Sequence, residues 1–164
     1  MKEIKQIFQD YMGHNVCFGC GKYNEEGLQI KSFWEGDEAV CRWRAASHHH
    51  GWKGIMNGGI MATLIDCHSM CTAMAHATRV ENRALGTAPH YKYATGTMTI
   101  RYLKPTSNLD EVVLRAQVTE MKGRKTVVKC DFYSKDIKTA EAEVIAIRVF
   151  SSDDENHNSA AFSA

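Results

Sequence analysis

The stretch NGGIMATLIDCHSMCTAMAHAT, residues 57–78, decides the fold. It contains no proline, lysine or arginine and is apolar nearly all round, which predicts a long helix buried on most sides. Asn57 is a suitable N-cap, because its side chain can accept hydrogen bonds from the first free N–H groups of a helix. The sequence therefore predicts a domain built around one central helix.

Strand patterns lie on both sides of this helix. Before it, residues 28–31 alternate, a turn follows at 34–37, and residues 39–44 alternate again, which predicts an antiparallel hairpin. After it come four strand-like runs separated by turn residues, at 97–104, 111–120, 125–133 and 140–150. Six strands and one buried helix predict an α+β domain in which one antiparallel sheet covers the helix.

The ends of the chain have a different character. Residues 2–12 place apolar side chains at helical spacing, which predicts a short amphipathic helix, and the Gly-, Asn- and Cys-rich segment after it is expected to be an ordered loop. We expect one domain over residues 1–150, with this helix and Cys-containing loop in residues 1–26. Residues 151–164 are polar and small, so we expect a disordered tail.

Composition excludes several classes of protein. With 164 residues, 44% of them apolar, the chain can build one core. Its 20 basic and 19 acidic residues are interspersed, so no nucleic-acid partner is expected. No run is long and apolar enough for a membrane span, and the start does not resemble a signal peptide, so we expect a cytoplasmic protein with reduced cysteines.

Three segments together resemble a known family: CFGCGKYNEEGL at 17–28, GWKGIMNGGIMATLIDCHS at 51–69 and TGTMTIRYLKPT at 95–106. In this order and spacing they are similar to the PaaI-like and THEM-like acyl-CoA thioesterases of the hotdog superfamily. The resemblance implies a hotdog fold, in which a six-stranded antiparallel sheet wraps around one long central helix. It also implies an acyl-CoA substrate, no cofactor, and a homodimer or homotetramer with active sites at the subunit interface.

Asp66 is the candidate catalytic carboxylate. A carboxylate within an apolar helix costs several kcal/mol if it is buried without partners, so something must offset that cost. One interpretation is that Asp66 emerges at the helix surface and meets only water or an arginine. The resemblance implies instead that it attacks the thioester carbonyl or activates water as a general base, and the sequence leaves these two routes open.

Gly58 and Gly59 are the candidate oxyanion site. They lack side chains, and the first N–H groups of a helix are unpaired and carry positive potential, so a substrate carbonyl could approach them. The alternative is that two glycines only allow the helix to pack closely. Relatives commonly carry His before this pair, and Asn57 stands here instead, able to cap the helix or to bind substrate.

Five further residues are candidates for substrate contact or for supporting Asp66. Thr95 is expected to orient the carboxylate or a water, with Thr97 one strand period away on the same side. His50 is expected to line the substrate entrance, Met70 the acyl pocket, and Arg124 a cationic patch for phosphates. The alternatives are bland in each case. The threonines could be present for their strand propensity, and His50 could lie in a solvated loop. Met70 could pack in the core, and Arg124 could belong to a solvated face.

The cysteines are not expected to bind metal. Cys17 and Cys20 have the spacing of a zinc or redox pair, but no second pair follows nearby, and a structural zinc site needs four ligands. Cys67 and Cys71 are interpreted as small buried thiols.

Three functions are compatible with these patterns. The first is hydrolysis of an acyl-CoA or related thioester, and the second is non-catalytic binding of acyl-CoA with the same fold. The third, a lyase acting on acyl thioesters, is disfavoured because Asp66 and His68 diverge on a helix.

Overall fold

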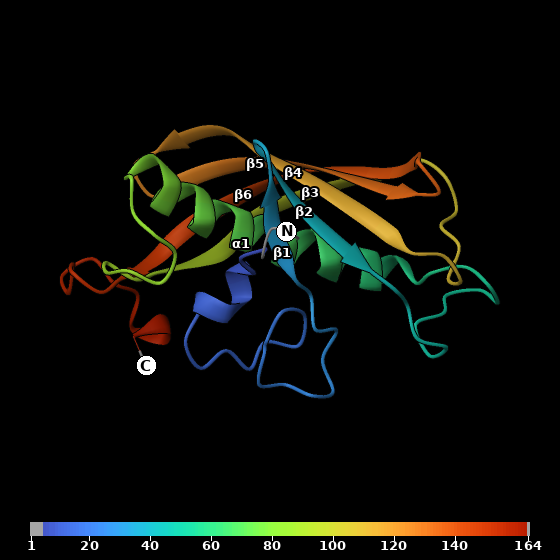
Figure 1. The fold of residues 1–164 in the computed structure, drawn as a ribbon, viewed down its shortest axis with the longest axis horizontal. Coiled ribbons are helices and arrows are strands. Elements are labelled where there is room, and N and C mark those ends of the chain that lie inside the picture. Colours follow the sequence, from blue (N-terminus) through green and yellow to red (C-terminus); the bar gives the residue numbers. More distant parts are fainter. Residues whose placement is uncertain (1–4, 164) are drawn as a thin grey trace.

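The computed structural model describes residues 5–163, in which a curved sheet lies over one long helix (Figure 1). The elements in chain order are η1 (Phe8–Tyr11), β1 (Ser32–Glu35), β2 (Glu38–Trp43), α1 (Gly58–Val80), β3 (Tyr91–Tyr102), β4 (Val112–Lys122), β5 (Lys125–Ser134), β6 (Ile137–Ser151) and η2 (Ala160–Phe162).

Helix α1 confirms the prediction made from residues 57–78. Asn57 is its N-cap, and the Asn57 side chain accepts hydrogen bonds from the N–H groups of Gly59 and Ile60. Leu64 and Ile65 are fully buried, and more than half of the helix residues are shielded from solvent. Burial on several sides is what an all-round apolar helix requires.

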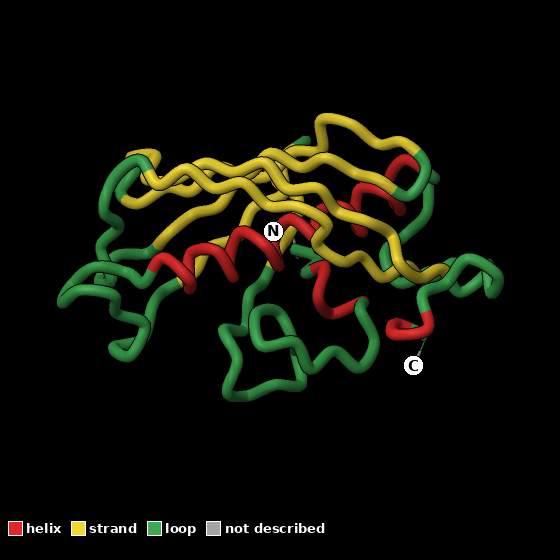
Figure 2. Tube along the Cα trace, turned by 180° about the vertical axis from the view of Figure 1, so that it is seen from behind, coloured by secondary structure: helices red, strands yellow, loops and turns green. Residues whose placement is uncertain are grey.

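The sheet is antiparallel with the strand order β1-β2-β4-β5-β6-β3, so β1 and β3 form its two edges. It covers one side of α1, while the chain before β1 lies against the other side (Figure 2). The small and branched core residues Ala116, Val128, Cys130 and Val144 face the helix from the central strands. The predicted six-stranded hotdog arrangement around a central helix is confirmed.

A buried polar chain ties the N-terminal segment to the helix. Gln9 Nε2 donates to Ser32 Oγ at 3.0 Å, and Ser32 Oγ lies 2.8 Å from His68 Nδ1. His68 Nε2 lies 3.1 Å from the carbonyl oxygen of Ala39. Because that carbonyl can only accept, Nε2 carries the proton and Nδ1 accepts from Ser32. The neutral imidazole is therefore satisfied at both nitrogens inside the core.

The N-terminal predictions need two corrections. The predicted helix over 2–12 is wrong in its described part, because residues 5–7 are not helical and only η1 forms; residues 1–4 lie outside the described residues. A single turn held by tertiary contacts stands in place of the predicted helix. The ring of buried Phe8 packs against that of Trp34, with the ring centroids 5.1 Å apart. The first strand begins at Ser32 rather than Leu28, because Gln29 has a positive φ of 52° that interrupts an extended chain.

The remaining strand boundaries lie close to the predictions, except that β3 begins at Tyr91, six residues before the predicted start at 97. The expectation of a disordered tail also differs from the structure. Ser151 N–H donates to Asn158 Oδ1 at 2.8 Å, and Lys92 Nζ donates to the carbonyl of Phe162 at 2.7 Å. Side-chain and backbone hydrogen bonds to β6 and β3 thus replace the apolar burial that the tail lacks.

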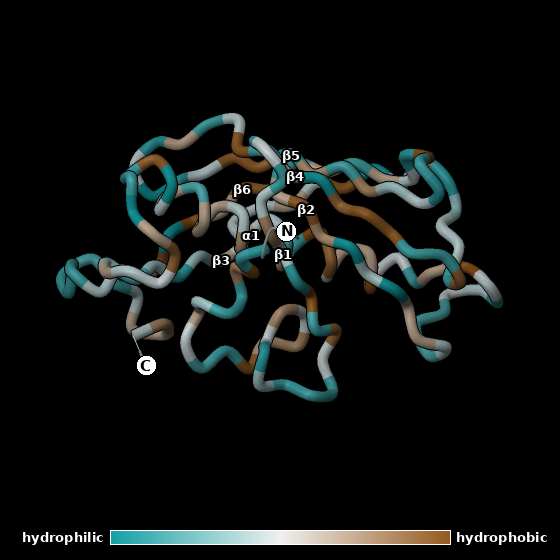
Figure 3. Tube along the Cα trace, viewed as in Figure 1, coloured by the Kyte–Doolittle hydropathy of each residue, from teal (hydrophilic) through white to brown (hydrophobic). Residues whose placement is uncertain are grey.

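Hydrophobic residues are found where the strands and α1 face one another, and the turns are mostly hydrophilic (Figure 3). Neither α1 nor any other helix in residues 5–163 combines the length and apolar character that crossing a membrane requires.

Acid is expected to destabilise the fold through His68. Burial lowers the pKa of His68 from 6.5 to about 4, although the bond to the Ala39 carbonyl opposes the shift. The unfolded chain therefore takes up a proton near pH 6.5 while the folded chain does not. Stability is complete above pH 6.5 and falls as the pH falls toward 4, by about 3 kcal/mol for this group. Urea unfolding at a series of pH values measures this loss.

The matched variants are His68→Gln and His157→Gln, the second at an exposed position in the tail. His157→Gln should retain the acid-dependent loss, and His68→Gln should lower stability at neutral pH but reduce the additional loss in acid. Equal acid dependence in wild type and His68→Gln would contradict the assignment.

Candidate active site

Asp66 and Thr95 meet where α1 passes under the edge strand β3. Thr95 Oγ1 donates a short hydrogen bond to Asp66 Oδ1. Asp66 is half-buried and Thr95 is exposed, so the pair lies at the surface of this chain rather than in its core. The hydroxyl holds one carboxylate oxygen, and within the part of the chain that the structure describes the other oxygen has no hydrogen-bond partner. The structure brings together these two predicted residues.

Thr97 does not join them, and the prediction that both threonines face the same side is wrong. Thr95 pairs with Ala146 of β6, whereas Thr97 pairs with Ile145, so one extra residue, Gly96, lies between them. Such a bulge reverses the alternation of side chains. Ala146 is buried against α1, so its partner Thr95 faces the helix, and Thr97 faces the opposite side of the sheet.

The glycine pair opens α1, as predicted, but its two N–H groups differ. Asn57 Oδ1 accepts from Gly59 N–H at 2.8 Å, so this donor is already used by the cap. Gly58 N–H has no acceptor among the described residues. A surface hollow of about 320 Å³ adjoins Gly58. Gly58 N–H is therefore the candidate oxyanion donor, and Asn57 acts as a helix cap.

Tyr102, which the sequence analysis did not name as a site residue, covers this end of the helix. Its hydroxyl donates to the carbonyl of Gly58 at 2.8 Å. Tyr102 lies in the segment TGTMTIRYLKPT, three residues before Pro105, so one of the three family-like segments already contained it. The contact fixes the last residue of β3 against the first residue of α1.

One chain cannot bring Asp66 and Gly58 to the same carbonyl. The two residues are eight positions apart on α1, and a rise of 1.5 Å per residue separates them by about 12 Å along the axis. An oxyanion donor and an attacking group must both lie about 3 Å from a single reacting carbonyl. The two halves of the site are present but apart.

A second hollow, of about 450 Å³, lies beyond Asp66 along the same two elements. Met74 contributes from α1, two turns after Asp66, and Tyr93 contributes from β3, two residues before Thr95. Burial raises the pKa of Tyr93, so its phenol is neutral at physiological pH. The sequence pattern did not indicate that Tyr93 lines this hollow, because the predicted strand started at residue 97.

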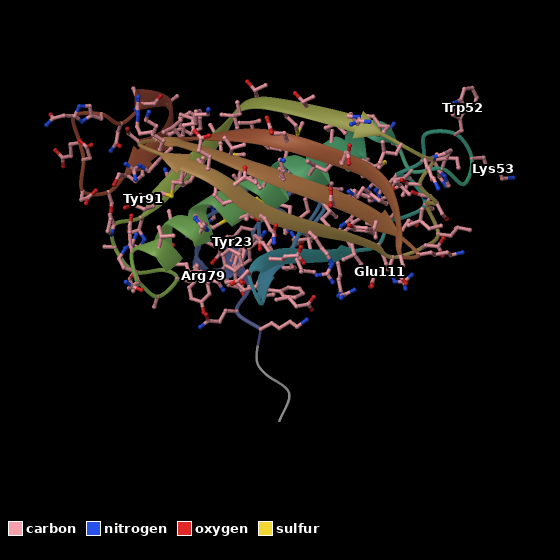
Figure 4. All side chains as sticks on the ribbon, turned by 90° about the horizontal axis from the view of Figure 1, so that it is seen from above. Tyr23, Trp52, Lys53, Arg79, Tyr91 and Glu111 are labelled. Carbon is pink, nitrogen blue, oxygen red and sulfur yellow. The ribbon has the colours of Figure 1, made fainter. Side chains whose placement is uncertain are left out.

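The other candidates have structural partners. His50 Nδ1 accepts from Gly54 N–H at 3.2 Å and so braces the loop before α1. That loop carries Trp52, 86% exposed, at the end of the molecule opposite Tyr91 (Figure 4). Met70 is half-buried against the core, one turn after Asp66. Arg124 donates to the carbonyl of His157 in the tail at 3.2 Å.

A separate group of side chains could hold a metal. The sulfurs of Cys17, Cys20 and Cys67 lie within 4.8 Å of one another.

A family model described as the Thioesterase superfamily matches residues 53–141, which span α1, Asp66 and strands β3 to β5. This chain belongs to the thioesterase superfamily. The chain is similar to the acyl-coenzyme A thioesterase THEM4 of Rattus norvegicus, with 29% identity over 127 residues. That match covers 75% of this chain and 49% of the relative. The THEM4 protein of Bos taurus is 27% identical over 145 residues, a match that covers 87% of this chain and 54% of the relative. The chain thus spans about half the length of the curated relatives it matches.

Solved structures agree on the fold. A thioesterase superfamily protein of Shewanella loihica is 29% identical with a TM-score of 0.59, covering 72% of this chain and 89% of its own. The Escherichia coli PaaI protein superposes with a TM-score of 0.62 at 15% identity, covering 76% and 82%. The Streptococcus mutans protein smu.793, solved bound to acetyl CoA, has a TM-score of 0.60 at 14% identity, covering 74% and 90%. The resemblance inferred from the three motifs is confirmed.

Replacing Asn57 should test its role as the helix cap. Asn57→Ala removes the acceptor of the Gly59 and Ile60 N–H groups and should lower the free energy of unfolding by about 1 kcal/mol. Asn57→Asp keeps the acceptor and should retain wild-type stability. Urea unfolding at neutral pH compares the variants, and an unchanged midpoint in Asn57→Ala would show that the cap carries no stability.

Proposed function

We propose that this chain hydrolyses acyl-CoA thioesters, with Asp66 as the catalytic carboxylate. The observation that carries the proposal is the Asp66–Thr95 pair in a chain of the thioesterase superfamily. The carboxylate is half-buried, one of its oxygens is held by Thr95, and the other has no hydrogen bond from residues 5–163. Relatives named acyl-coenzyme A thioesterase support the substrate class. So do fold neighbours solved with acetyl CoA and with coenzyme A.

The chemistry requires an ionised carboxylate beside a polarised carbonyl. As a general base, Asp66 takes a proton from water while the water oxygen attacks the carbonyl carbon. The carbonyl oxygen becomes negative and accepts from Gly58 N–H. The C–S bond then breaks, and the leaving thiolate takes the proton from Asp66, which gives the free acid and the thiol. As a nucleophile, Asp66 would instead form a mixed anhydride that water hydrolyses.

The separation of about 12 Å between Asp66 and Gly58 supports a site shared by two chains. Edge strand β3 supplies the pairing surface, because one side of its backbone is bonded to β6 and the other side is an open edge. Two copies that join their β3 edges in a homodimer continue the sheet and place α1 beside the partner's α1. Asp66 of one chain can then face Gly58 of the other.

The two hollows suggest where the two parts of the substrate bind. The apolar hollow beside Met74 and Tyr93 suits the acyl group, with Met70 between it and Asp66. The hollow beside Gly58 also contacts Lys104, whose ammonium group suits a phosphate of the CoA portion. Arg124 is retained as a substrate contact only if its bond to the tail opens. The cytoplasmic location expected from the sequence stays a prediction.

One observation favours the second candidate, a binding protein without turnover. Asn57 occupies Gly59 N–H, which leaves a single oxyanion donor on the helix end. A weaker oxyanion site slows reaction without preventing acyl-CoA binding. Tight CoA binding with no hydrolysis across acetyl, medium-chain, long-chain and phenylacetyl thioesters would favour this second function.

Asp66→Asn should abolish most of the hydrolysis. The amide can still accept from Thr95 but cannot take a proton or attack, so kcat should fall on the order of 10²–10⁴-fold. Thioester absorbance measures turnover without a thiol reagent, which the six protein cysteines would confuse. Asp131→Asn, on β5 and paired with Lys138, is the matched control and should keep wild-type activity. Full activity in Asp66→Asn would overturn the proposed role.

Gly58→Pro should remove the oxyanion donor without breaking the helix. Gly58 is the first helical residue, where proline is tolerated, and Asn57 already has the extended conformation that precedes proline. Gly58→Ala adds a Cβ in ordinary van der Waals contact, 3.6 Å from the nearest Tyr102 atom, but keeps the N–H. Activity should fall in Gly58→Pro and persist in Gly58→Ala.

Mixing the two inactive variants tests the shared site. Random dimers of Gly58→Pro and Asp66→Asn chains contain one intact site in each mixed pair, so about a quarter of wild-type activity should return. The mixture is refolded from urea so that the chains exchange. Persistent inactivity in a mixture shown to contain mixed dimers would place both groups in the same chain's site and contradict the arrangement.

A further inference from the structure

The cysteines singled out in the sequence meet on the side of α1 that faces away from the sheet. The chain over residues 13–31 forms a loop without helix or strand against this side of α1 (Figure 1). Cys17 and Cys20 come from a tight turn in the loop, and Cys67 comes from the helix. A loop of this length without secondary structure needs specific contacts to hold one conformation.

The sulfur positions match those of a metal–thiolate centre. Cys17 Sγ lies 3.7 Å from Cys67 Sγ, and these two sulfurs and Cys20 Sγ all lie within 4.8 Å of one another. Tetrahedral zinc with Zn–S bonds of about 2.3 Å holds its sulfurs about 3.8 Å apart. The three thiols therefore need only small shifts to share one ion.

Two glycines leave space for the close approach of backbone and sulfur atoms. A Cβ added to Gly19 would lie 2.3 Å from Cys67 Sγ, so any side chain there would displace the thiol. Gly21 N–H donates to the Cys17 carbonyl at 2.9 Å, and a Cβ on Gly21 would lie 2.4 Å from Cys17 N. Both glycines are required for the turn to bring its cysteines onto the helix.

Asn15 supports the same turn. Its side-chain oxygen accepts from Cys17 N–H at 2.9 Å, and its amide donates to Cys20 Sγ at 3.4 Å. A hydrogen bond to sulfur orients the ligand and stabilises a thiolate, the form that binds metal.

Cys71 is the candidate fourth ligand. It follows Cys67 by one helical turn, so both thiols leave the same side of α1. It is fully buried, and its thiol donates to Met12 Sδ at 3.6 Å. It lies outside the group of three sulfurs within 4.8 Å of one another, so its side chain has to move to share an ion with them. His14 is nearer in sequence but is exposed and stacked on Tyr23.

We propose that Cys17, Cys20, Cys67 and Cys71 form a structural zinc site that fastens loop 13–31 to α1. Four thiolates favour Zn²⁺ in tetrahedral coordination, with no position left for substrate. The sequence predicted no metal because no second pair of cysteines follows near the first. The second pair comes from α1, and Cys67 lies 47 residues after Cys20. The site is independent of the proposed hydrolysis.

A disulfide is the competing use of these thiols. Joining Cys17 and Cys67 would release two electrons and two protons to an oxidant, and the zinc site needs no such reactant. The two alternatives differ in mass and metal content, so one experiment separates them.

The experiment measures metal in the full chain. Protein is purified with a phosphine reductant, without chelator or metal-affinity resin, and zinc is quantified by inductively coupled plasma mass spectrometry. About one zinc ion per chain is expected, as for a closed four-ligand site. Replacement by Co²⁺ should produce thiolate-to-cobalt charge transfer and the d–d bands of tetrahedral cobalt.

Alanine variants assign the ligands. Cys17→Ala, at the exposed ligand, changes the core least and should lose the ion, as should Cys20→Ala and Cys67→Ala. Cys71→Ala should weaken binding and alter the cobalt spectrum. Cys130→Ala, at a fully buried cysteine of β5, is the matched control and should keep the zinc.

Three results would overturn the proposal. The first is fully reduced, folded wild-type protein that takes up neither Zn²⁺ nor Co²⁺. The second is bound metal that survives the loss of Cys17, Cys20 and Cys67 one at a time. The third is metal-free protein that lacks two hydrogens in its unreduced mass because Cys17 and Cys67 are joined.

Discussion

The buried imidazole of His68 fixes how α1 is rotated about its own axis. Its two nitrogens are bonded to Ser32 of β1 and to the Ala39 carbonyl of β2, both in the core. Rotating the helix would leave these polar groups buried without partners, at a cost of about 1–3 kcal/mol for each group. Apolar packing alone tolerates sliding and rotation better than a pair of directional bonds does. The helix is therefore held in one orientation beneath the sheet.

That orientation directs three consecutive side chains to three different surfaces. At 3.6 residues per turn, neighbours on a helix point about 100° apart. Asp66 reaches Thr95 on the edge strand, Cys67 reaches Cys17 in the loop, and His68 reaches the β1–β2 hairpin. The candidate catalytic carboxylate, the contact with the loop and the buried imidazole thus share one turn of helix. A rotation of α1 would displace all three contacts together.

The fold could be predicted from the sequence because the patterns that indicate it are local. Residues 57–78 encode a buried helix by composition, and Asn57 encodes its start by capping chemistry. Asp66, Gly58 and Thr95 are candidates because the order of the motifs resembles the family pattern. Other features depend on contacts between distant segments. The bulge at Gly96, which separates Thr95 from Thr97, depends on pairing with β6, and the cysteine cluster depends on a loop folding back on a helix.

The open edge of β3 has a consequence for how the proposed activity depends on protein concentration. If a working site needs Asp66 from one chain and Gly58 from another, an isolated chain contributes nothing, however well it folds. The hydrolytic activity per chain then rises with the concentration of the protein while most chains are single. It stops rising once nearly all chains are paired. On that arrangement, a substitution along the outer edge of β3 would shift the concentration at which chains pair without altering any reacting group.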